Sequence, residues 1–282
     1  MHNLYYSLSF CDVDRPGQIL DRSALTKQQR WELADKLAED RLPAINATLE
    51  PVAPPDTFYA KHGKRILDIV ISLPVFLITL PINVFIGIVT LIDVGRPIMF
   101  KQDRVGRDGK KFVLLKFRNM TEVKDKNGDL LPPEKRVTSW GKFVRKTSLD
   151  ELLNLWSILK GDMSIIGPRP LLPEHEHRFN IRHRSRMTVR PGLECPPHED
   201  ADHVLTRQEQ FENDVWYVEN LSFKTDVKQV GRLFKLALNK KSTEARATSA
   251  RGIFMGYSED GVAITLEDVP QEYIDLFEEE QN

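Results

Sequence analysis

The sequence of 282 residues predicts an α/β membrane protein with a re-entrant helix, a small sheet and amphipathic helices at the membrane interface. Three features of the chain predict this fold. An uncharged run of 24 residues extends from Ile69 to Ile92, short runs of strand-forming residues follow it, and leucines recur at helical spacing after Ser148. The length suits one main domain with additional segments.

The uncharged run is long enough to span a bilayer, for which about 20 apolar residues suffice. Two features favour a helix that dips into the membrane and returns. Pro81 lies near the middle of the run, where its ring removes a backbone hydrogen bond. Basic residues flank the run on both sides, so the positive-inside rule favours two cytoplasmic ends. A full span stays open, because proline also occurs in spanning helices.

The remaining elements follow from residue patterns. Strands are expected at residues 97–100 and 112–117, with Gly106 and Gly109 marking turns between them. A short amphipathic helix is expected from Ser148 to a cap at Gly161. Another helix is expected at residues 26–40, where three apolar side chains predict docking onto an unidentified partner segment. These are Trp31, Leu33 and Leu37.

The net charge of -1 conceals an uneven distribution. Residues 61–190 hold 25 Lys and Arg against 13 Asp and Glu, whereas the flanks hold 15 against 28. A basic middle suits phosphate-rich partners such as nucleotides, nucleic acid or an anionic membrane face. The two cysteines, Cys11 and Cys195, argue against a disulfide framework. The N-terminus lacks a signal-peptide pattern, so folding in the cytoplasm is expected.

Asp150 and Glu151 are the acids with the strongest case for chemistry. Ser148 precedes Glu151 by three residues, which is a capping-box pattern and by itself explains both acids structurally. The same geometry favours ionised Asp150 beside a positive helix end, with Arg145 nearby, and so suits a carboxylate nucleophile. Glu151 points about 100° away on a helix, where it would hold a divalent cation.

A second candidate is the segment Gly161 to Pro170. Pro168 and Pro170 fix the backbone on both sides of Arg169, and an arginine held in this way suits bidentate phosphate recognition. A structural loop whose arginine caps a helix is the alternative, and the local sequence alone favours it.

A set of ordered motifs then indicates a family. The motifs are Lys64-Arg65-Ile66-Leu67-Asp68, Gln102-Asp103-Arg104-Val105-Gly106, Lys116-Phe117-Arg118-Asn119-Met120, Ser148-Leu149-Asp150-Glu151-Leu152, Lys160-Gly161-Asp162-Met163-Ser164, Gly167-Pro168-Arg169-Pro170-Leu171, Arg190-Pro191-Gly192 and Asp214-Val215-Trp216-Tyr217-Val218-Glu219-Asn220. Across about residues 61–240 the chain resembles the monotopic phosphoglycosyl transferases, a family of bacterial sugar transferases.

The resemblance implies a reaction. Such enzymes transfer a phosphosugar from a UDP-sugar to undecaprenyl (polyprenyl) phosphate at the cytoplasmic face of the bacterial inner membrane, release UMP and begin glycoconjugate assembly. The route is two-step: Asp150 would attack the sugar-bearing phosphate and Glu151 would help bind Mg²⁺. The resemblance also implies substrate or phosphate contacts from Lys116, Arg118, Arg145, Pro168, Arg169, Arg190 and Asp214.

The same resemblance divides the chain and strengthens the re-entrant prediction at Pro81. Residues 1–60 form an N-terminal extension and linker, 61–96 the re-entrant membrane helix, 97–240 the catalytic domain and 241–282 a C-terminal extension. Membrane lipids are expected partners, nucleic acid is not, and a homodimer is left open.

Two positions depart from the family pattern. Small members usually carry Ser-Pro at the helix break, whereas this chain has Leu80-Pro81, so a hydroxyl bond to the helix backbone must come from Thr79 or be absent. After Gly192 the family has Thr-Gly-Trp-Ala-Gln, whereas this chain continues with another sequence, which puts donor recognition in doubt. That sequence is Leu193-Glu194-Cys195-Pro196-Pro197-His198.

Two further groups of residues have simpler explanations than a binding site. His175 and His177 with their neighbouring glutamates are expected to be solvent-exposed and not to bind a metal. The arginines between Arg178 and Arg190 are expected on a helix lying on anionic headgroups, in preference to nucleic-acid binding. A non-catalytic membrane scaffold, motivated by the altered segment after Gly192, is the alternative to an enzyme.

Overall fold

The computed structural model describes residues 22, 25–126, 128, 130–199, 203–238 and 252–275. This part of the chain combines helices with three two-stranded sheets, where the sequence predicted a single small sheet. The helices are α1 (Lys27–Asn46), α2 (Lys64–Val94), α3 (Pro133–Arg136), α4 (Ser139–Lys146), α5 (Asn154–Lys160), α6 (Ile181–Arg184), α7 (Arg207–Glu219) and α8 (Phe223–Leu238). The strands are β1 (Met99–Val105), β2 (Lys111–Phe117), β3 (Ser164–Ile166), β4 (Gly192–Glu194), β5 (Phe254–Tyr257) and β6 (Ala263–Thr265).

β1 and β2 form an antiparallel hairpin that runs from the pair Met99 and Phe117 to the pair Val105 and Lys111. Alternate residues of β2 face inward, so Phe112 and Leu114 pack with residues of α5 in a buried cluster. β1 extends beyond the predicted residues 97–100, through a charged stretch that periodicity does not identify as a strand. The hairpin carries Lys116 to the edge of the site described below.

β3 and β4 are parallel and short, with Ser164 opposite Gly192 and Ile166 opposite Glu194. Their ends approach so closely that a side chain at Gly192 would place its Cβ 2.2 Å from the backbone nitrogen of Gly167. Glycine is therefore required at this contact. The pairing fixes the loop that begins at Gly167 and carries Arg169.

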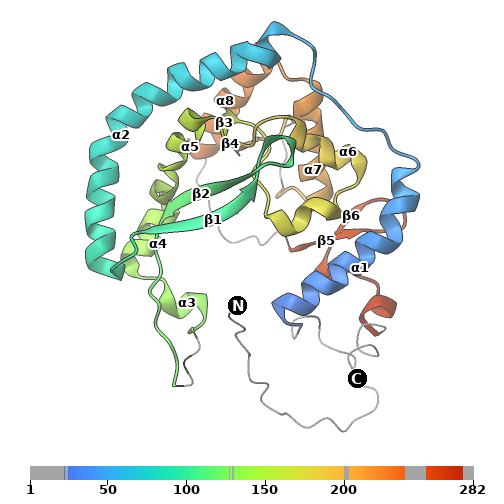
Figure 1. Cartoon of the computed structure of the whole chain (residues 1–282), viewed down its shortest axis with the longest axis horizontal. Coiled ribbons are helices and arrows are strands. Elements are labelled where there is room, and N and C mark those ends of the chain that lie inside the picture. The colour runs from blue at the N-terminus through green and yellow to red at the C-terminus, as the bar shows by residue number, and fades with distance from the viewer. Residues whose placement is uncertain are drawn as a thin grey trace.

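α2 is a continuous helix of 31 residues that contains Pro74 and Pro81, and it bends around the rest of the molecule (Figure 1). Together with the turn before it, Tyr59–Val94, it is long and apolar enough to cross a membrane. The Thr79 hydroxyl donates to the carbonyl of Val75 at 2.8 Å. A hydroxyl bond to the helix backbone is thus present near Pro81, and it comes from Thr79, the residue from which the sequence required it if it was to be present at all.

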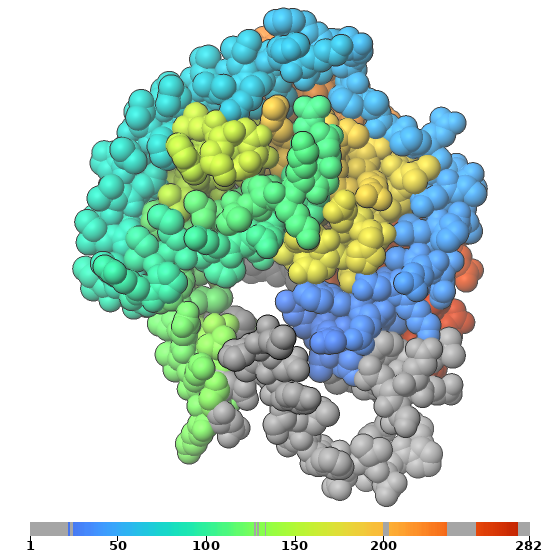
Figure 2. Space-filling view, viewed as in Figure 1, coloured from blue at the N-terminus to red at the C-terminus, as the bar shows by residue number. Residues whose placement is uncertain are grey.

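Both ends of α2 are attached to the same globular part of the chain. At its start, Arg65 donates to the carbonyl of Leu159 at 2.6 Å, and Asp68 accepts from the Ser164 hydroxyl at 2.9 Å. At its end, Arg118 donates to the carbonyl of Val94 and Thr138 donates to Asp93 at 2.6 Å. In Figure 2 the helix forms the outer margin of the molecule, with α5 and the β1–β2 hairpin inside its curve.

The described parts of the two predicted extensions pack against each other. Thr26 caps α1 through a capping box, and Leu33 and Leu37 are fully buried. Their partners are residues of β5, β6 and the segment after β6, among them Met255 and Ile264. The docking partner that the sequence left unidentified is therefore the C-terminal segment of the same chain (Figure 1).

The prediction of a headgroup-binding helix around Arg178 to Arg190 is wrong. The helical part, α6, has only four residues, and Arg178 and Arg186 are almost completely buried. Arg178 donates to Asp35 of α1 at 2.6 Å, and His177 contacts the same carboxylate at 2.7 Å. Arg178 and Arg186 have acidic and carbonyl partners inside the fold, which the sequence spacing could not indicate, whereas Arg184 is exposed.

The α1 contact predicts a stability effect. Leu37→Ala removes a buried side chain between α1 and β5 and should lower the free energy of unfolding by about 3 kcal/mol, through lost burial and a residual cavity. Thermal denaturation in detergent measures it. Glu39→Ala, at an exposed position of the same helix, is the matched control and should change little. Equal effects of the two substitutions would contradict the packing described here.

Candidate active site

The two acids lie on a single tight turn between α4 and α5, the 3₁₀ turn Leu149–Glu151. The predicted capping box is absent. Ser148 adopts the left-handed conformation with φ 55°, and its side chain makes no capping bond, while its carbonyl accepts from the Glu151 amide at 3.2 Å. The left-handed backbone conformation of Ser148 therefore sets the direction of the turn that holds Asp150 and Glu151.

Each acid has a different partner from the end of β2. Lys116 Nζ donates to Glu151 Oε1 at 2.6 Å, and Asn119 Nδ2 donates to Asp150 Oδ2 at 3.3 Å. Asp150 is 7% exposed, whereas Glu151 is partly exposed. The hairpin and the turn thus separate a buried carboxylate from one that is tied up in an ion pair.

The surroundings move the two pKa values in opposite directions. Burial raises the pKa of Asp150, and Lys116 and Arg145 offset part of this effect. Burial also acts to raise the pKa of Glu151, but the positive charges of Lys116 and Arg169 outweigh it and hold that pKa below its ordinary value. Glu151 therefore stays ionised more firmly than Asp150.

Arg169 lies between two carboxylates. Its guanidinium is 3.7 Å from Glu151 Oε1, and Nη1 donates to Glu194 Oε2 at 3.0 Å. The charge of Glu194 raises the pKa of Arg169 further. Arg104 is close enough for Arg169 to depress its pKa, after the larger effect of burial. We call these six residues the charged cluster: Arg104, Lys116, Asp150, Glu151, Arg169 and Glu194.

Asp214 is buried and is connected to the charged cluster through Arg186. Its carboxylate pairs with Arg186 at 2.6 Å, and both side chains are almost completely buried. Arg186 Nη2 also donates to the backbone carbonyl of Arg169 at 3.1 Å. Asp214 therefore positions the Arg169 loop through Arg186. Its contact with substrate stays a prediction.

The other predicted contacts are dispersed. Arg145 is exposed and near enough to stabilise ionised Asp150. Arg118 donates to carbonyls at the end of α2, including that of Arg96 at 3.3 Å. Arg190 donates to the carbonyl of Gly161 at 2.9 Å. The last two side chains thus stabilise backbone turns.

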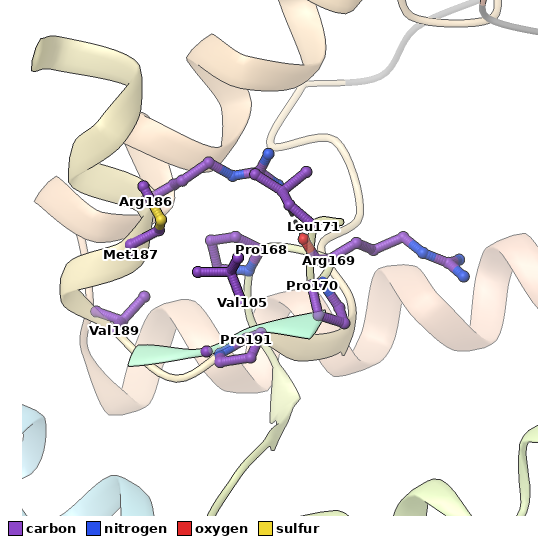
Figure 3. A pocket seen from close by; sticks show the side chains of 10 residues that line it. Val105, Pro168, Arg169, Pro170, Leu171, Arg186, Met187, Val189 and Pro191 are labelled. Carbon is purple, nitrogen blue, oxygen red and sulfur yellow. Dashed lines mark hydrogen bonds between the residues drawn. The ribbon is translucent and has the colours of Figure 1, made fainter. Parts of the chain in front are cut away.

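Pro168 lines a small pocket behind the Arg169 loop (Figure 3). The lining is mainly apolar and includes Val105, Met187 and Pro191, but neither Asp150 nor Glu151. In Figure 3 the side chain of Arg169 extends away from this pocket. The pocket is therefore not lined by the pair of acids.

Sequence reasoning missed four contributors to the site: Arg104, Asn119, Arg186 and Glu194. Arg104 and Asn119 belong to recognised motifs, so their motif membership was an available signal. Glu194 was noted only as part of an altered segment, and Arg186 as part of a basic run. Their roles depend on the β3–β4 pairing and on Asp214, which bring together residues far apart in the chain.

Comparisons with known proteins agree with the motif order. The chain is 40% identical over 165 residues to an uncharacterized sugar transferase, EpsL, of Bacillus subtilis, which is 58% of this chain and 82% of that protein. It is 30% identical over 194 residues to an undecaprenyl-phosphate galactose phosphotransferase of Salmonella typhimurium, covering 63% of this chain and 40% of that protein.

A third relative is a UDP-glucose:undecaprenyl-phosphate glucose-1-phosphate transferase of Escherichia coli, 28% identical over 263 residues, 85% of this chain and 55% of that protein. The chain thus spans most of EpsL but only about half or less of the two relatives with named substrates. The family profile described as bacterial sugar transferase matches residues 59–240, which include α2 and the whole charged cluster. The chain belongs to the bacterial sugar transferase family.

Proposed function

We propose that this protein transfers a phosphosugar from a UDP-sugar to undecaprenyl phosphate through a covalent intermediate on Asp150. The observation that carries the proposal is the position of Asp150, a buried carboxylate close to Lys116 and Arg145. Its neighbour Glu151 lies 3.7 Å from the guanidinium of Arg169. Relatives with names for this type of transfer share the family region.

In the first step an oxygen of ionised Asp150 attacks the phosphorus that bears the sugar. A new oxygen–phosphorus bond forms, the phosphoanhydride bond breaks, and UMP leaves with the bonding electron pair. In the second step a phosphate oxygen of undecaprenyl phosphate attacks the same phosphorus and releases the Asp150 carboxylate. The products are a lipid-linked diphosphosugar and UMP, so atoms and charge balance.

The cluster supplies the electrostatics that phosphoryl transfer requires. Burial makes ionised Asp150 a less solvated and more reactive carboxylate. Lys116 and Arg145 offset part of the rise in its pKa, and the Asn119 amide donates to it. Arg169 presents a half-exposed guanidinium that suits the phosphate oxygens. Positioning and neutralisation of charge are the main contributions to this class of reaction.

The residues fit a divalent cation that is completed by substrate. Within the described residues no group of three His, Cys, Asp or Glu side chains forms a metal cage. Mg²⁺ usually takes one or two carboxylates together with substrate phosphates, and Glu151, with its lowered pKa, suits that role beside Asp150. When bound, Mg²⁺ would neutralise phosphate charge during transfer.

Membrane attachment gives access to the lipid acceptor. A straight helix of 31 residues would extend about 46 Å, yet both ends of α2 contact the same domain, which favours re-entry at Pro81 over a full span. Large apolar side chains are exposed on α2 and also on α4, α5 and α8, among them Phe143, Trp156 and Phe234. These surfaces suit a protein lying on the cytoplasmic face of the inner membrane.

The central test is Asp150→Asn. We expect UMP release from any accepted UDP-sugar to fall by about a thousandfold or more, because the amide is a poor nucleophile. Mass spectrometry of the wild-type protein incubated with donor alone should detect a phosphosugar on Asp150. Full activity of the variant would exclude the nucleophile assignment. A folded wild-type protein that uses no donor would favour the scaffold alternative.

The same substitution has an expected effect on stability. The folded-state pKa of Asp150 lies above its unfolded value, so ionised Asp150 lowers stability at neutral pH, and this cost disappears below the unfolded pKa. Asp150→Asn should therefore melt at the same or a higher temperature than the wild-type protein at pH 7, with the difference shrinking at pH 4. A clear loss of melting temperature at pH 7 would contradict the raised pKa.

Lys116 should determine the pH at which kcat/KM falls on the acidic side of its pH profile. Lys116→Met removes a charge that lowers the pKa of Asp150, so UMP release should begin to fall at a higher pH as the solution is acidified. The pH dependence of kcat/KM measures the shift. Lys111→Met, exposed on the same strand, should leave the acidic limb unchanged. An unmoved limb in Lys116→Met would remove Lys116 from this role.

The topology of α2 can be tested by cysteine labelling. We expect Asp56→Cys and Lys101→Cys, each in a variant with Cys11 and Cys195 replaced by serine, to react with a membrane-impermeant maleimide only after cells are opened. Both positions are exposed; Asp56 precedes α2 in the chain and Lys101 follows it. Labelling of one of them in intact cells would indicate a spanning helix.

A further inference from the structure

Glu194 is a charged residue of the site that the proposed reaction does not use. It stands in the segment after Gly192 that departs from the family pattern, at the end of β4. Its carboxylate binds Arg169 at 3.0 Å, while the same guanidinium is 3.7 Å from Glu151. A single guanidinium thus separates Glu194 from the acid turn.

The backbone around Glu194 is held from several sides. Its carbonyl accepts from the Gly167 amide at 3.2 Å, and the following residues are tied to α7 by Asn213. Asn213 accepts from the His198 amide at 2.8 Å and donates to the carbonyl of Cys195 at 3.3 Å. The His198 ring stacks on Trp216 with centroids 4.3 Å apart. Glu194 therefore presents its charge from a fixed position.

The order of charges indicates which part of a donor meets Glu194. With the sugar-bearing phosphate at Asp150 and Arg169, the sugar and the UMP moiety must extend in different directions. Arg145 lies near Asp150, whereas the guanidinium of Arg169 donates directly to the carboxylate of Glu194. The second phosphate of the donor is anionic and favours the Arg145 side, so the sugar is left on the Glu194 side.

We propose that Glu194 makes this site select UDP-sugars whose sugar is uncharged and reject those whose sugar carries a carboxylate. The inference rests on the proposed function. A uronic acid would bring a second carboxylate toward Glu194, with Arg169 already shared between Glu194 and the phosphate. Sugar hydroxyls can instead donate to Glu194. Repulsion against one class of ligand is a common source of specificity.

The experiment compares UDP-glucose with UDP-glucuronate as donors for the full-length protein in detergent. The wild-type protein should have a kcat/KM for UDP-glucose at least about tenfold higher than for UDP-glucuronate, because like charges repel in a partly buried site. Glu194→Gln keeps the shape and an acceptor for Arg169, and should reduce that ratio by about tenfold. Glu194→Asp keeps the charge and should keep discrimination.

Glu199→Gln is the matched control, since it makes the same charge change directly after the altered segment, at a side chain that is 86% exposed. Its ratio should equal that of the wild-type protein. Equal use of both donors by the wild-type protein overturns the inference alone, as does an unchanged ratio in Glu194→Gln or an equal shift in Glu199→Gln. The wild-type comparison decides the matter even if Glu194→Gln does not fold. A folded wild-type protein that uses neither these nor other UDP-sugars overturns the proposed function, and the inference with it.

Discussion

The ion pair between Lys116 and Glu151 is the interaction on which the arrangement of the site depends. It joins the end of the β1–β2 hairpin to the turn between α4 and α5, two segments separated by 35 positions. A partly buried carboxylate is costly without a cation, so the pair holds both segments in register. Asp150, next to Glu151, is then placed against Asn119 of the same hairpin end. One contact thus fixes the partners of both acids.

The apolar helix α2 and the charged cluster are held by neighbouring segments of the chain. Arg118, two residues after Lys116, binds the C-terminal end of α2. Near the N-terminal end of α2, Arg65 binds the end of α5 and Asp68 binds the start of β3. α5 follows the acid turn, and β3 leads into the Arg169 loop. Any change in the bend of α2 would therefore be transmitted to both sides of the charged cluster. The position of α2 and the geometry of the charged cluster are therefore linked.

The terminal segments contribute more than the sequence indicated. α1 and the β5–β6 hairpin share a core, and a second cluster connects Phe254 and Tyr257 with Phe179 and Phe211. The guanidinium of Arg186 lies over the rings of Phe179 and Phe211 and also binds Asp214 and the Arg169 backbone. The β5–β6 hairpin thus packs against the aromatic side chains that contact Arg186, and Arg186 in turn binds the Arg169 backbone. The family profile ends at residue 240, before this hairpin begins.

The sequence by itself determined the family, the apolar helix with its proline, the pair of acids and the basic loop at Arg169. Local order and residue type suffice for these, because motifs and hydropathy are properties of neighbouring residues. Tertiary structure alone decided which charges meet. It replaced the capping box at Ser148 with a left-handed turn, and it buried Arg178 and Arg186 on either side of α6. It also directed Arg118 and Arg190 to backbone carbonyls and paired Asp214 with Arg186. It also set Glu194 against Arg169 through the parallel pairing of β3 and β4. The physical reason is that an ion pair depends on distance in space and on burial, and neither can be read from spacing along the chain.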